Sequence, residues 1–429
     1  MHKLKQLIYL ITIISLFMSC NDDNGQFIID PNDYFSPASN EFIMATLPET
    51  GELVYWSSDR IIHDDIRLNL DNSETLDLTL GKATDTGFTF RTFRDISSGF
   101  IANSFARSEY PHPCYDNDLD NILSGKQLEV ILEGTTELVE VINPLTNSLI
   151  FGDQGSNTDV INDVIYDYDR NVTIIRGKEF FALDIQFVFR FADEQEYKSI
   201  IIKKEDWVLG TGQKYNVELK REDLSNCQAH SIDVDIESEW IIDSEVLTND
   251  DERIRIAKWS SYKENQSGNA INIFLDESIE MKKLSIQLSS NNTLNRYSLQ
   301  KTFDVIPTSL ELNTFTTEAA DLTPESFTIL NGGDYDLLES TYEYATDSST
   351  SKWTVFQTNN SSLTYSLPTI IPEYLEKNAI VEPLLSNPTQ FQLETYSTSI
   401  DINEVYSISN IDLQLHCLDY NSKLNTIVL

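Results

Sequence analysis

Histidine, cysteine and basic residues are scarce in this 429-residue sequence. It has five histidines and four cysteines, and its 30 Lys and Arg residues face 69 Asp and Glu residues, for a formal net charge of −39. No Cys-x-x-Cys pair and no closely spaced histidine pair occurs, which argues against zinc and dithiol sites. Such an acidic chain repels phosphate backbones, so we expect no nucleic-acid partner.

Local catalytic signatures are also missing. The sequence has no GxSxG, HExxH, P-loop or GxGxxG pattern. A distant carboxylate pair for glycoside hydrolysis leaves no local signature, so an uncharacterised hydrolase stays open as the third hypothesis. We predict that the protein is not an enzyme and assign no catalytic residue.

Long apolar runs are absent after the N-terminus, which itself has the form of a secretory signal. Basic residues in Met1–Lys5 precede an apolar run from Leu7 to Met18 and then Ser19-Cys20. The run is too short to span a bilayer comfortably. The end of this segment, with Cys20 at the cut site, resembles a bacterial lipobox. This resemblance implies that Cys20 is lipidated and becomes the mature N-terminus. The alternative is a plain secreted protein cut nearby.

The residues after Cys20 bear on where the protein is exported. Asn21-Asp22-Asp23-Asn24 resembles the acidic export signal of Bacteroidota surface lipoproteins. That resemblance implies a protein anchored in the outer membrane by the lipid on Cys20 and facing the cell exterior. The alternative is that Asp and Asn simply dominate a flexible tether.

Three cysteines remain once Cys20 is lipidated. Cys114 and Cys227 lie in loop-like sequence, whereas Cys417 lies in the apolar strand Leu413 to Leu418. One disulfide and one free thiol is the simplest arrangement in an oxidising compartment. We predict a Cys114–Cys227 disulfide and a buried Cys417 thiol.

Apolar and polar residues alternate with period two throughout the chain, as in Leu76 to Leu80, Ser231 to Ile236 and Lys283 to Leu288. Such runs are typical of half-buried strands. A hydrophobic content of 40% suffices for folded cores. We therefore predict an all-β fold of two to four antiparallel β-sandwich (Ig-like) modules in tandem.

Composition and turn clusters divide the chain into segments. The predicted order is a lipoprotein signal (1–19), an acidic tether (20–40), a β-sandwich module (41–107), an acidic loop (108–126), a second module (127–241) and a C-terminal β region (244–429) that could be two modules split near Pro307. Within the second module, Lys198 to Lys204 and Lys214 to Lys220 are predicted to form a hairpin.

The run Tyr115 to Asn121 is the best candidate for metal chemistry. Asp116, Asp118 and Asp120 recur at every second position, as at the start of a calcium loop. Asn121 and Gln127 stand where an EF-hand needs Gly and Glu, so a full EF-hand is rejected. A looser calcium site and a solvated acidic loop both remain open, and we expect no cofactor other than calcium.

Two further features bear on ligands. Exposed aromatic side chains stack on sugar rings, and Trp56 and Trp259 each precede serines at a strand end, whereas Trp207, Trp240 and Trp353 are expected in cores. Leu47-Pro48-Glu49-Thr50-Gly51 spells a sortase signal, but it lies far from the C-terminus, so an ordinary turn is predicted.

The pattern of Asp206 to Leu219 predicts a strand, a glycine turn and a second strand. It resembles a hairpin of Bacteroidota fimbrillin-type proteins.

The leading hypothesis for function is a non-catalytic surface module that binds a glycan or protein partner, for nutrient uptake or adhesion. The fimbrillin resemblance implies the rival hypothesis, a structural or pilus-anchor component.

Overall fold

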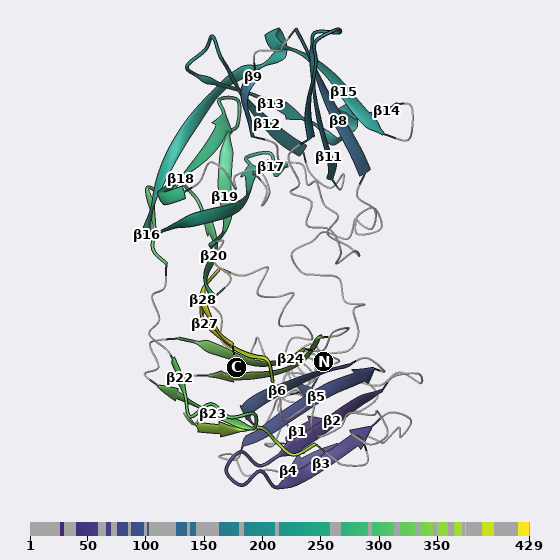
Figure 1. Ribbon diagram of the computed structural model, residues 1–429, viewed down its shortest axis with the longest axis vertical. Coiled ribbons are helices and arrows are strands. Elements are labelled where there is room, and N and C mark those ends of the chain that lie inside the picture. The colour runs from purple at the N-terminus through teal and green to yellow at the C-terminus, as the bar shows by residue number, and fades with distance from the viewer. Residues whose placement is uncertain are drawn as a thin grey trace, which may run out of the picture.

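The structure is a computed structural model. It describes residues 26–29, 40–58, 66–69, 75–84, 87–97, 101–102, 126–134, 138–142, 163–179, 184–210, 214–257, 267–290, 294–312, 318–330, 335–345, 350–358, 364–370, 374, 388–398 and 419–428. These residues are almost entirely strands, so the predicted all-β fold is confirmed. Most strand pairs are antiparallel, in agreement with the prediction, and five described pairs are parallel. Figure 1 shows the strands gathered in an upper and a lower group, with β20 and β28 between them.

The top of the upper group is a β-sandwich. One layer is a five-stranded sheet in the order β10-β11-β8-β15-β14. Its strands are β10 (Asp163–Asp167), β11 (Val172–Glu179), β8 (Lys126–Glu133), β15 (Tyr215–Lys220) and β14 (Val208–Leu209). The facing layer contains β9 (Leu138–Ile142), β12 (Asp184–Phe191) and β13 (Tyr197–Ile202). Phe187, Phe189 and Trp207 are buried between the two layers. Each sheet has an apolar face rich in β-branched and aromatic residues, and packing the two faces together removes these side chains from water.

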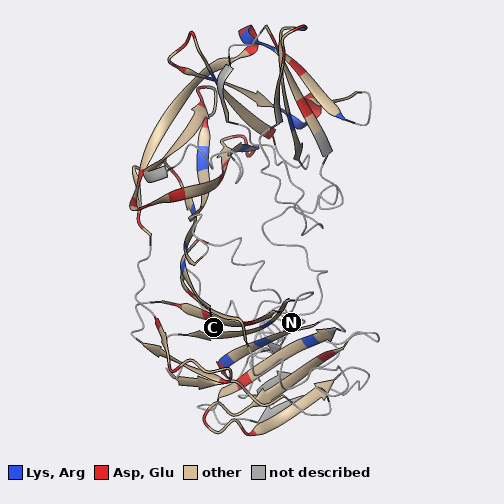
Figure 2. Ribbon diagram, viewed as in Figure 1, with Lys and Arg blue, Asp and Glu red and all other residues tan. Residues whose placement is uncertain are grey.

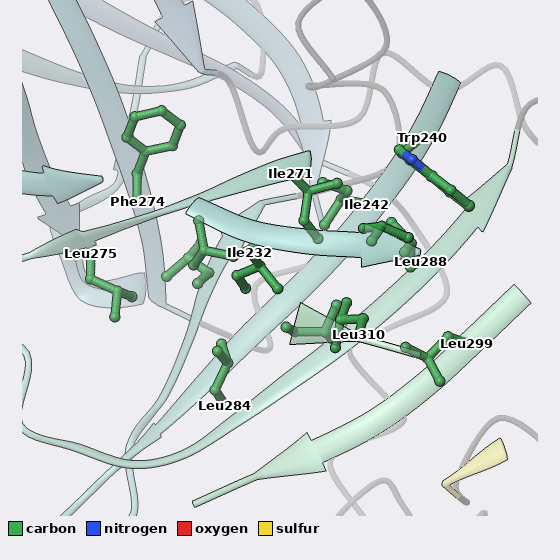
Figure 3. Packing of buried hydrophobic residues seen from close by; sticks show 14 of the residues in the cluster. Ile232, Trp240, Ile242, Ile271, Phe274, Leu275, Leu284, Leu288, Leu299 and Leu310 are labelled. Carbon is green, nitrogen blue, oxygen red and sulfur yellow. The ribbon is translucent and has the colours of Figure 1, made fainter. Parts of the chain in front are cut away.

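A second apolar core lies beside the long strand β16 (Ser225–Thr248). Every second residue from Ile232 to Val246 faces this core or its margin, so the predicted alternation is confirmed for this strand. Trp240 is 1% exposed, which confirms its predicted core role. Figure 3 shows side chains of several strands gathered there. The contributing partners are β17 (Arg253–Ala257), β18 (Ser267–Asp276), β19 (Met281–Ser290), β20 (Asn295–Phe303) and β21 (Ser309–Leu310).

The lower group combines strands from both ends of the chain. Its main sheet runs through β3 (Leu53–Ser58), β2 (Glu41–Thr46), β5 (Thr75–Thr84), β6 (Gly87–Ser97), β25 (Thr350–Thr358), β24 (Leu337–Ala345), β27 (Gln390–Thr398) and β28 (Tyr420–Val428). A small sheet packs against it through Phe327, Ile329 and Tyr365, and contains β22 (Glu318–Ala320), β23 (Ser326–Leu330) and β26 (Thr364–Ser366).

A short sheet and two 3-10 turns are also present. A three-stranded sheet pairs β1 (Gln26–Ile29) with β4 (Ile66–Asn69) and β7 (Ile101–Ala102). Single 3-10 turns occur at Lys204–Asp206 and Arg221–Asp223. In the part of the chain that the structure describes, no helix is long and apolar enough to cross a membrane.

One sheet joins the two groups. Strand β28 pairs with β27 on one side and with β20 on the other. Strand β20 in turn pairs with β19, and β19 pairs with β16. Strand β6, from the predicted 41–107 module, pairs in parallel with β25 near the C-terminus. The hydrogen-bonded sheet thus crosses the predicted boundaries at 107 and 244. Pro307 lies between β20, which pairs with β28, and β21, which pairs with β16.

The predicted hairpin of residues 198–204 and 214–220 is wrong. Strand β13 pairs with β12 and β16, whereas β15 pairs with β14 and β8 in the opposite layer. Trp207 is 7% exposed and lies where the chain crosses between layers, so its burial favours the crossing over a local turn. The shorter strand–turn–strand predicted within Asp206 to Leu219 is present as β14 and β15.

The predicted half-buried strand at Leu76 to Leu80 is buried on both faces. Asp77 and Thr79, expected in water, are 4% and 0% exposed. Both lie on the face that carries Phe90 and Trp353, which the small sheet covers. A buried polar stripe beside an aromatic core is the feature that defines the candidate site.

Candidate functional site

A pocket of about 820 Å³ opens in the lower group, within the size range usual for small-molecule sites. Three segments surround it: the turn between β2 and β3, the ends of β5 and β6, and β26 with the three residues that follow it. The lining residues are Thr46, Leu47, Pro48, Glu49, Thr50, Gly51, Asp77, Arg94, Asp95, Thr364, Tyr365, Ser366, Leu367, Pro368 and Thr369.

The turn that spells Leu47 to Gly51 forms one wall. The amide of Gly51 donates to the carbonyl of Leu47 at 2.8 Å, and the amide of Leu47 donates to the carbonyl of Glu52 at 2.9 Å. Gly51 has φ of +68°, a conformation that glycine adopts at little cost. The turn predicted for this motif is therefore confirmed.

A β-bulge builds the floor. Leu76 pairs with Ile96 and Leu78 pairs with Phe93, so Arg94 and Asp95 on β6 together face Asp77 on β5. Asp95 takes the left-handed conformation, with φ of 53°, that such an extra residue often requires. Its amide donates to Asp77 Oδ1 at 3.0 Å, and its Oδ1 accepts from Thr75 Oγ1 at 3.4 Å. The bulge thereby brings Asp77, Arg94 and Asp95 to one place.

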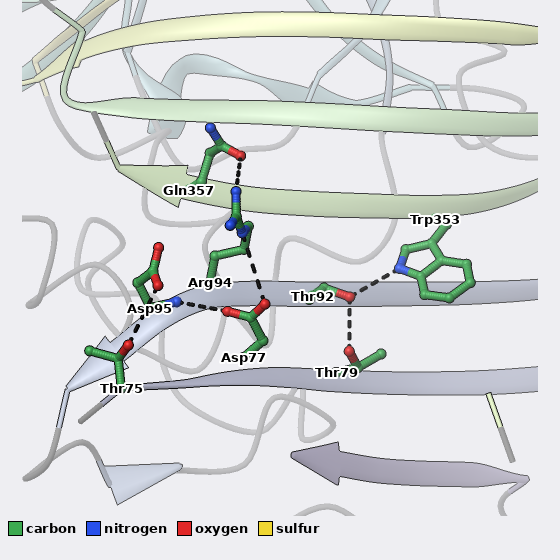
Figure 4. Close-up of polar contacts among 8 residues, drawn as sticks. All are labelled: Thr75, Asp77, Thr79, Thr92, Arg94, Asp95, Trp353 and Gln357. Carbon is green, nitrogen blue, oxygen red and sulfur yellow. Dashed lines mark hydrogen bonds and ion pairs between the residues drawn. The ribbon is translucent and has the colours of Figure 1, made fainter. Parts of the chain in front are cut away.

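Arg94 is 2% exposed and is held from three directions. Its Nη1 donates to Gln357 Oε1 at 3.0 Å, and its Nε lies 3.9 Å from Asp77 Oδ2. The guanidinium carbon lies 4.2 Å from the centre of the Tyr365 ring, a cation–π arrangement. Figure 4 shows Arg94 between Asp77 and Gln357. A buried guanidinium fixed in this way cannot swing freely toward solvent.

A second polar chain stiffens the same floor. Trp353 Nε1 donates to Thr92 Oγ1 at 3.0 Å, and the hydroxyls of Thr92 and Thr79 lie 2.9 Å apart, as Figure 4 shows. Trp353 is 3% exposed, so its predicted core role is confirmed. Because a buried donor without a partner costs about 1–3 kcal/mol, these contacts favour one arrangement of the strands.

Burial dominates the electrostatics of the floor. Desolvation raises the pKa of Asp77 to about 6, although Arg94 and the Asp95 amide favour the ionised form. Desolvation also raises the pKa of Tyr365, so its phenol stays protonated at neutral pH. A carboxyl with a perturbed pKa in a pocket is a reason to consider a functional site.

The wall and floor are suited to binding polar ligands. Hydroxyl groups of Thr50, Thr364, Ser366 and Thr369 stand on exposed residues around the opening. The carboxylates lie deeper or at the turn, and Leu47, Pro48, Leu367 and Pro368 supply apolar surface. Hydroxyl, carboxylate and apolar groups together offer hydrogen bonds, negative charge and apolar contact to a small polar molecule.

Most site residues predicted from sequence lie outside the described residues: Cys20, Cys114, Asp116, Asp118, Asp120 and Trp259. The lipid, calcium and Trp259 hypotheses therefore stay predictions. Among the residues that the structure does describe, no group of three or more His, Cys, Asp or Glu side chains could hold a metal ion.

The two remaining predicted residues are described. Trp56 is partly buried and packs against the lower core. Cys227 is a free thiol among the described residues, and its predicted partner Cys114 lies outside them, so the Cys114–Cys227 disulfide stays a prediction. Cys227 lies within β16 opposite Tyr197 and Asp276, in a strand paired on both sides rather than in a loop. Desolvation raises the pKa of Cys227 to about 12, so the thiol stays protonated at neutral pH.

The residues that define the pocket were not found from sequence. The alternation of Leu76 to Leu80 predicts Asp77 on the solvent side of its strand, and Arg94 and Asp95 belong to no motif. A local signal exists in Arg94-Asp95, two adjacent residues of opposite charge that follow the alternating Phe88 and Phe90 in the same strand. A scan against protein-family models and a search of curated proteins both find no match for this chain.

Proposed function

We propose that this chain is a lipid-anchored protein on the outer face of the outer membrane that binds a glycan without converting it. The single observation that carries the binding proposal is the 820 Å³ pocket with its buried Asp77–Arg94 floor. The sequence supports the location through the basic, apolar and Ser19-Cys20 pattern of the N-terminus.

The acidic surface is consistent with this location. Figure 2 shows Asp and Glu on strands and turns of both groups. Such a surface repels anionic headgroups, so contact with the membrane would depend on the lipid at Cys20. Labelled palmitate should enter the wild-type protein and not the Cys20→Ala variant, and protease added to intact cells should remove the anchored protein.

A glycan array tests the binding proposal. The mature chain should retain at least one glycan, and Ser366→Tyr should abolish retention because the bulky side chain fills the mouth of the pocket. Ser231→Tyr is the matched control: it places the same substitution at an exposed strand serine outside the pocket. Bound glycan should be recovered unchanged, since a shortened product would instead support the hydrolase hypothesis. If neither the wild-type chain nor the Ser231→Tyr control retains any glycan, the proposal is contradicted.

A second candidate is a structural component that assembles through a sheet edge. Its support is β14, the outer strand of its sheet among the described residues, where Val208 and Leu209 are 64% and 59% exposed. Exposed apolar edges are sites of strand addition. The protein should then be present in purified surface fibres, and Val208→Lys should remove it from them. Absence of the wild-type chain from fibres would exclude this candidate.

A further inference from the structure

The charges of the pocket do not balance. Its lining contains three carboxylates, on Glu49, Asp77 and Asp95, and one cationic group, on Arg94. Arg94 is paired with Asp77 and donates to Gln357, so its charge is already matched within the floor. The carboxylates of Glu49 and Asp95 are left over among the described lining residues.

These two carboxylates stand at different depths. Asp95 is half-buried on the bulge, where Oδ1 accepts one long hydrogen bond from Thr75. Glu49 is exposed on the turn at the wall. A bound cation would therefore meet the half-buried carboxylate of Asp95 at the floor and the exposed carboxylate of Glu49 at the wall. The net charge of −39 on the whole chain adds to this attraction and steers cations toward the surface.

The chemistry favours an ammonium group over a metal ion. Calcium requires six to eight oxygen ligands, and no cluster of three acidic side chains occurs among the described residues. An ammonium group has three donors, which one carboxylate and nearby hydroxyls can satisfy. Thr50, Thr364 and Ser366 supply such hydroxyls at the mouth of the pocket.

We propose that this pocket selects a glycan unit that carries a protonated amino group, with Asp95 and Glu49 receiving the ammonium. The proposal rests on the proposed glycan-binding function and names the ligand class for the same site. An anionic sugar would face the two unmatched carboxylates, and a neutral sugar would leave them without a counter-charge. Arg94 is a positioning residue here, because it orders Asp77 and the bulge instead of contacting the ligand.

Three short oligomers with the same β-1,4 backbone test the proposal by calorimetry at mildly acidic pH, where the amino groups of glucosamine units carry a proton. They are the oligomers of glucosamine, N-acetylglucosamine and glucose, which differ at one ring substituent. The glucosamine oligomer should bind about tenfold more tightly than the other two, as expected for a charge-assisted hydrogen bond. High salt should reduce this advantage, because the partly exposed ion pairs are screened.

The variants locate the binding. Asp95→Asn should remove the advantage of the glucosamine oligomer, since Asn tolerates the left-handed backbone and keeps the amide contact to Asp77. Asp251→Asn is the matched control, because Asp251 also has a positive φ (63°) and lies on a turn outside the pocket. Equal loss with both variants, or none with Asp95→Asn, would show that the amine binds elsewhere and would overturn the proposal.

The outcomes separate this proposal from the function on which it rests. Tighter binding of the glucose or N-acetylglucosamine oligomer, abolished by Ser366→Tyr, would overturn amine selection and leave glycan binding standing. If no oligomer binds, amine selection fails, and the glycan array alone decides the broader function.

Discussion

At the scale of single residues, Asp77 is the group whose environment departs most from what its sequence context suggests. It is 4% exposed, and its pKa is raised to about 6 from 3.8, chiefly by desolvation. The folded state therefore holds a proton on Asp77 more tightly than the unfolded state. The resulting stabilisation is fully present below about pH 4 and is lost as the pH rises through about 6.

The Asp77→Asn variant makes this titration measurable. Asn cannot ionise, but its side-chain oxygen can still accept from the Asp95 amide. Between about pH 4 and pH 7, the free energy of unfolding of the wild type should fall by on the order of 3 kcal/mol relative to the variant. Urea unfolding of both proteins across this pH range measures the difference. A difference that does not change with pH would contradict the buried ionisation of Asp77.

Gly81 is required by a close approach of two rings. A Cβ built at Gly81 would lie 2.5 Å from ring atoms of both Phe42 and Phe90, whose ring centres are 5.2 Å apart. Gly81→Ala should therefore destabilise the protein by about 2 kcal/mol through overpacking. Thermal unfolding measures the loss. The double variant with Phe42→Leu should recover part of it, and simple addition of the two single effects would contradict the steric explanation.

At the scale of elements, the bulge between β5 and β6 creates the site. Because Asp95 has φ of 53°, a side chain with an ordinary Cβ is strained there, whereas glycine is not. Asp95→Gly should keep the bulge, and Asp95→Ala should be less stable than Asp95→Gly by about 1 kcal/mol. Urea unfolding of the two variants provides the comparison. Equal stability would indicate that the left-handed conformation is not maintained at this position.

The strands and the turn around the bulge could be predicted from the local sequence, whereas the burial of Asp77 could not. The alternation at Leu76 to Leu80 and Ser231 to Ile236 predicted strands, and both are present as β5 and β16. Pro48 and Gly51 predicted their turn for a local reason, because each restricts or frees its own backbone. The burial of Asp77 could not be predicted in this way, since it depends on β26, which is far away in sequence and covers that face with Tyr365.

The pairing partners of the strands are the second feature that the sequence pattern does not determine. Alternation identifies which residues of β13 and β15 face a core, but it is the same whether the neighbour is the next strand or one in another layer. The predicted pairing of these two strands failed for this reason. The pocket depends on one such non-local pairing, that of β6 with β25, because Gln357 of β25 accepts the hydrogen bond from Arg94.

At the scale of the whole molecule, the first and last parts of the chain depend on each other. Strand β6 pairs with β25, and Phe90 meets Trp353 edge-on with ring centres 5.3 Å apart. Phe42 contacts Tyr374, and Phe88 contacts Tyr344, so these rings, which also contact Phe90, have further aromatic partners after residue 340. Residues 41–107 alone would lose those partners and expose more of the rings to water.

We therefore expect a fragment of residues 41–107 to remain unfolded, because the apolar surface it can bury by itself is too small. Amides of β6 should exchange quickly with solvent in the fragment and slowly in the full chain, as hydrogen exchange read by mass spectrometry can measure. Adding a fragment of residues 318–429, which supplies β25 and Trp353, should slow that exchange. If the 41–107 fragment alone unfolds cooperatively and protects β6, the N-terminal strands form an independent module, and the pairing of β6 with β25 contributes little to their stability.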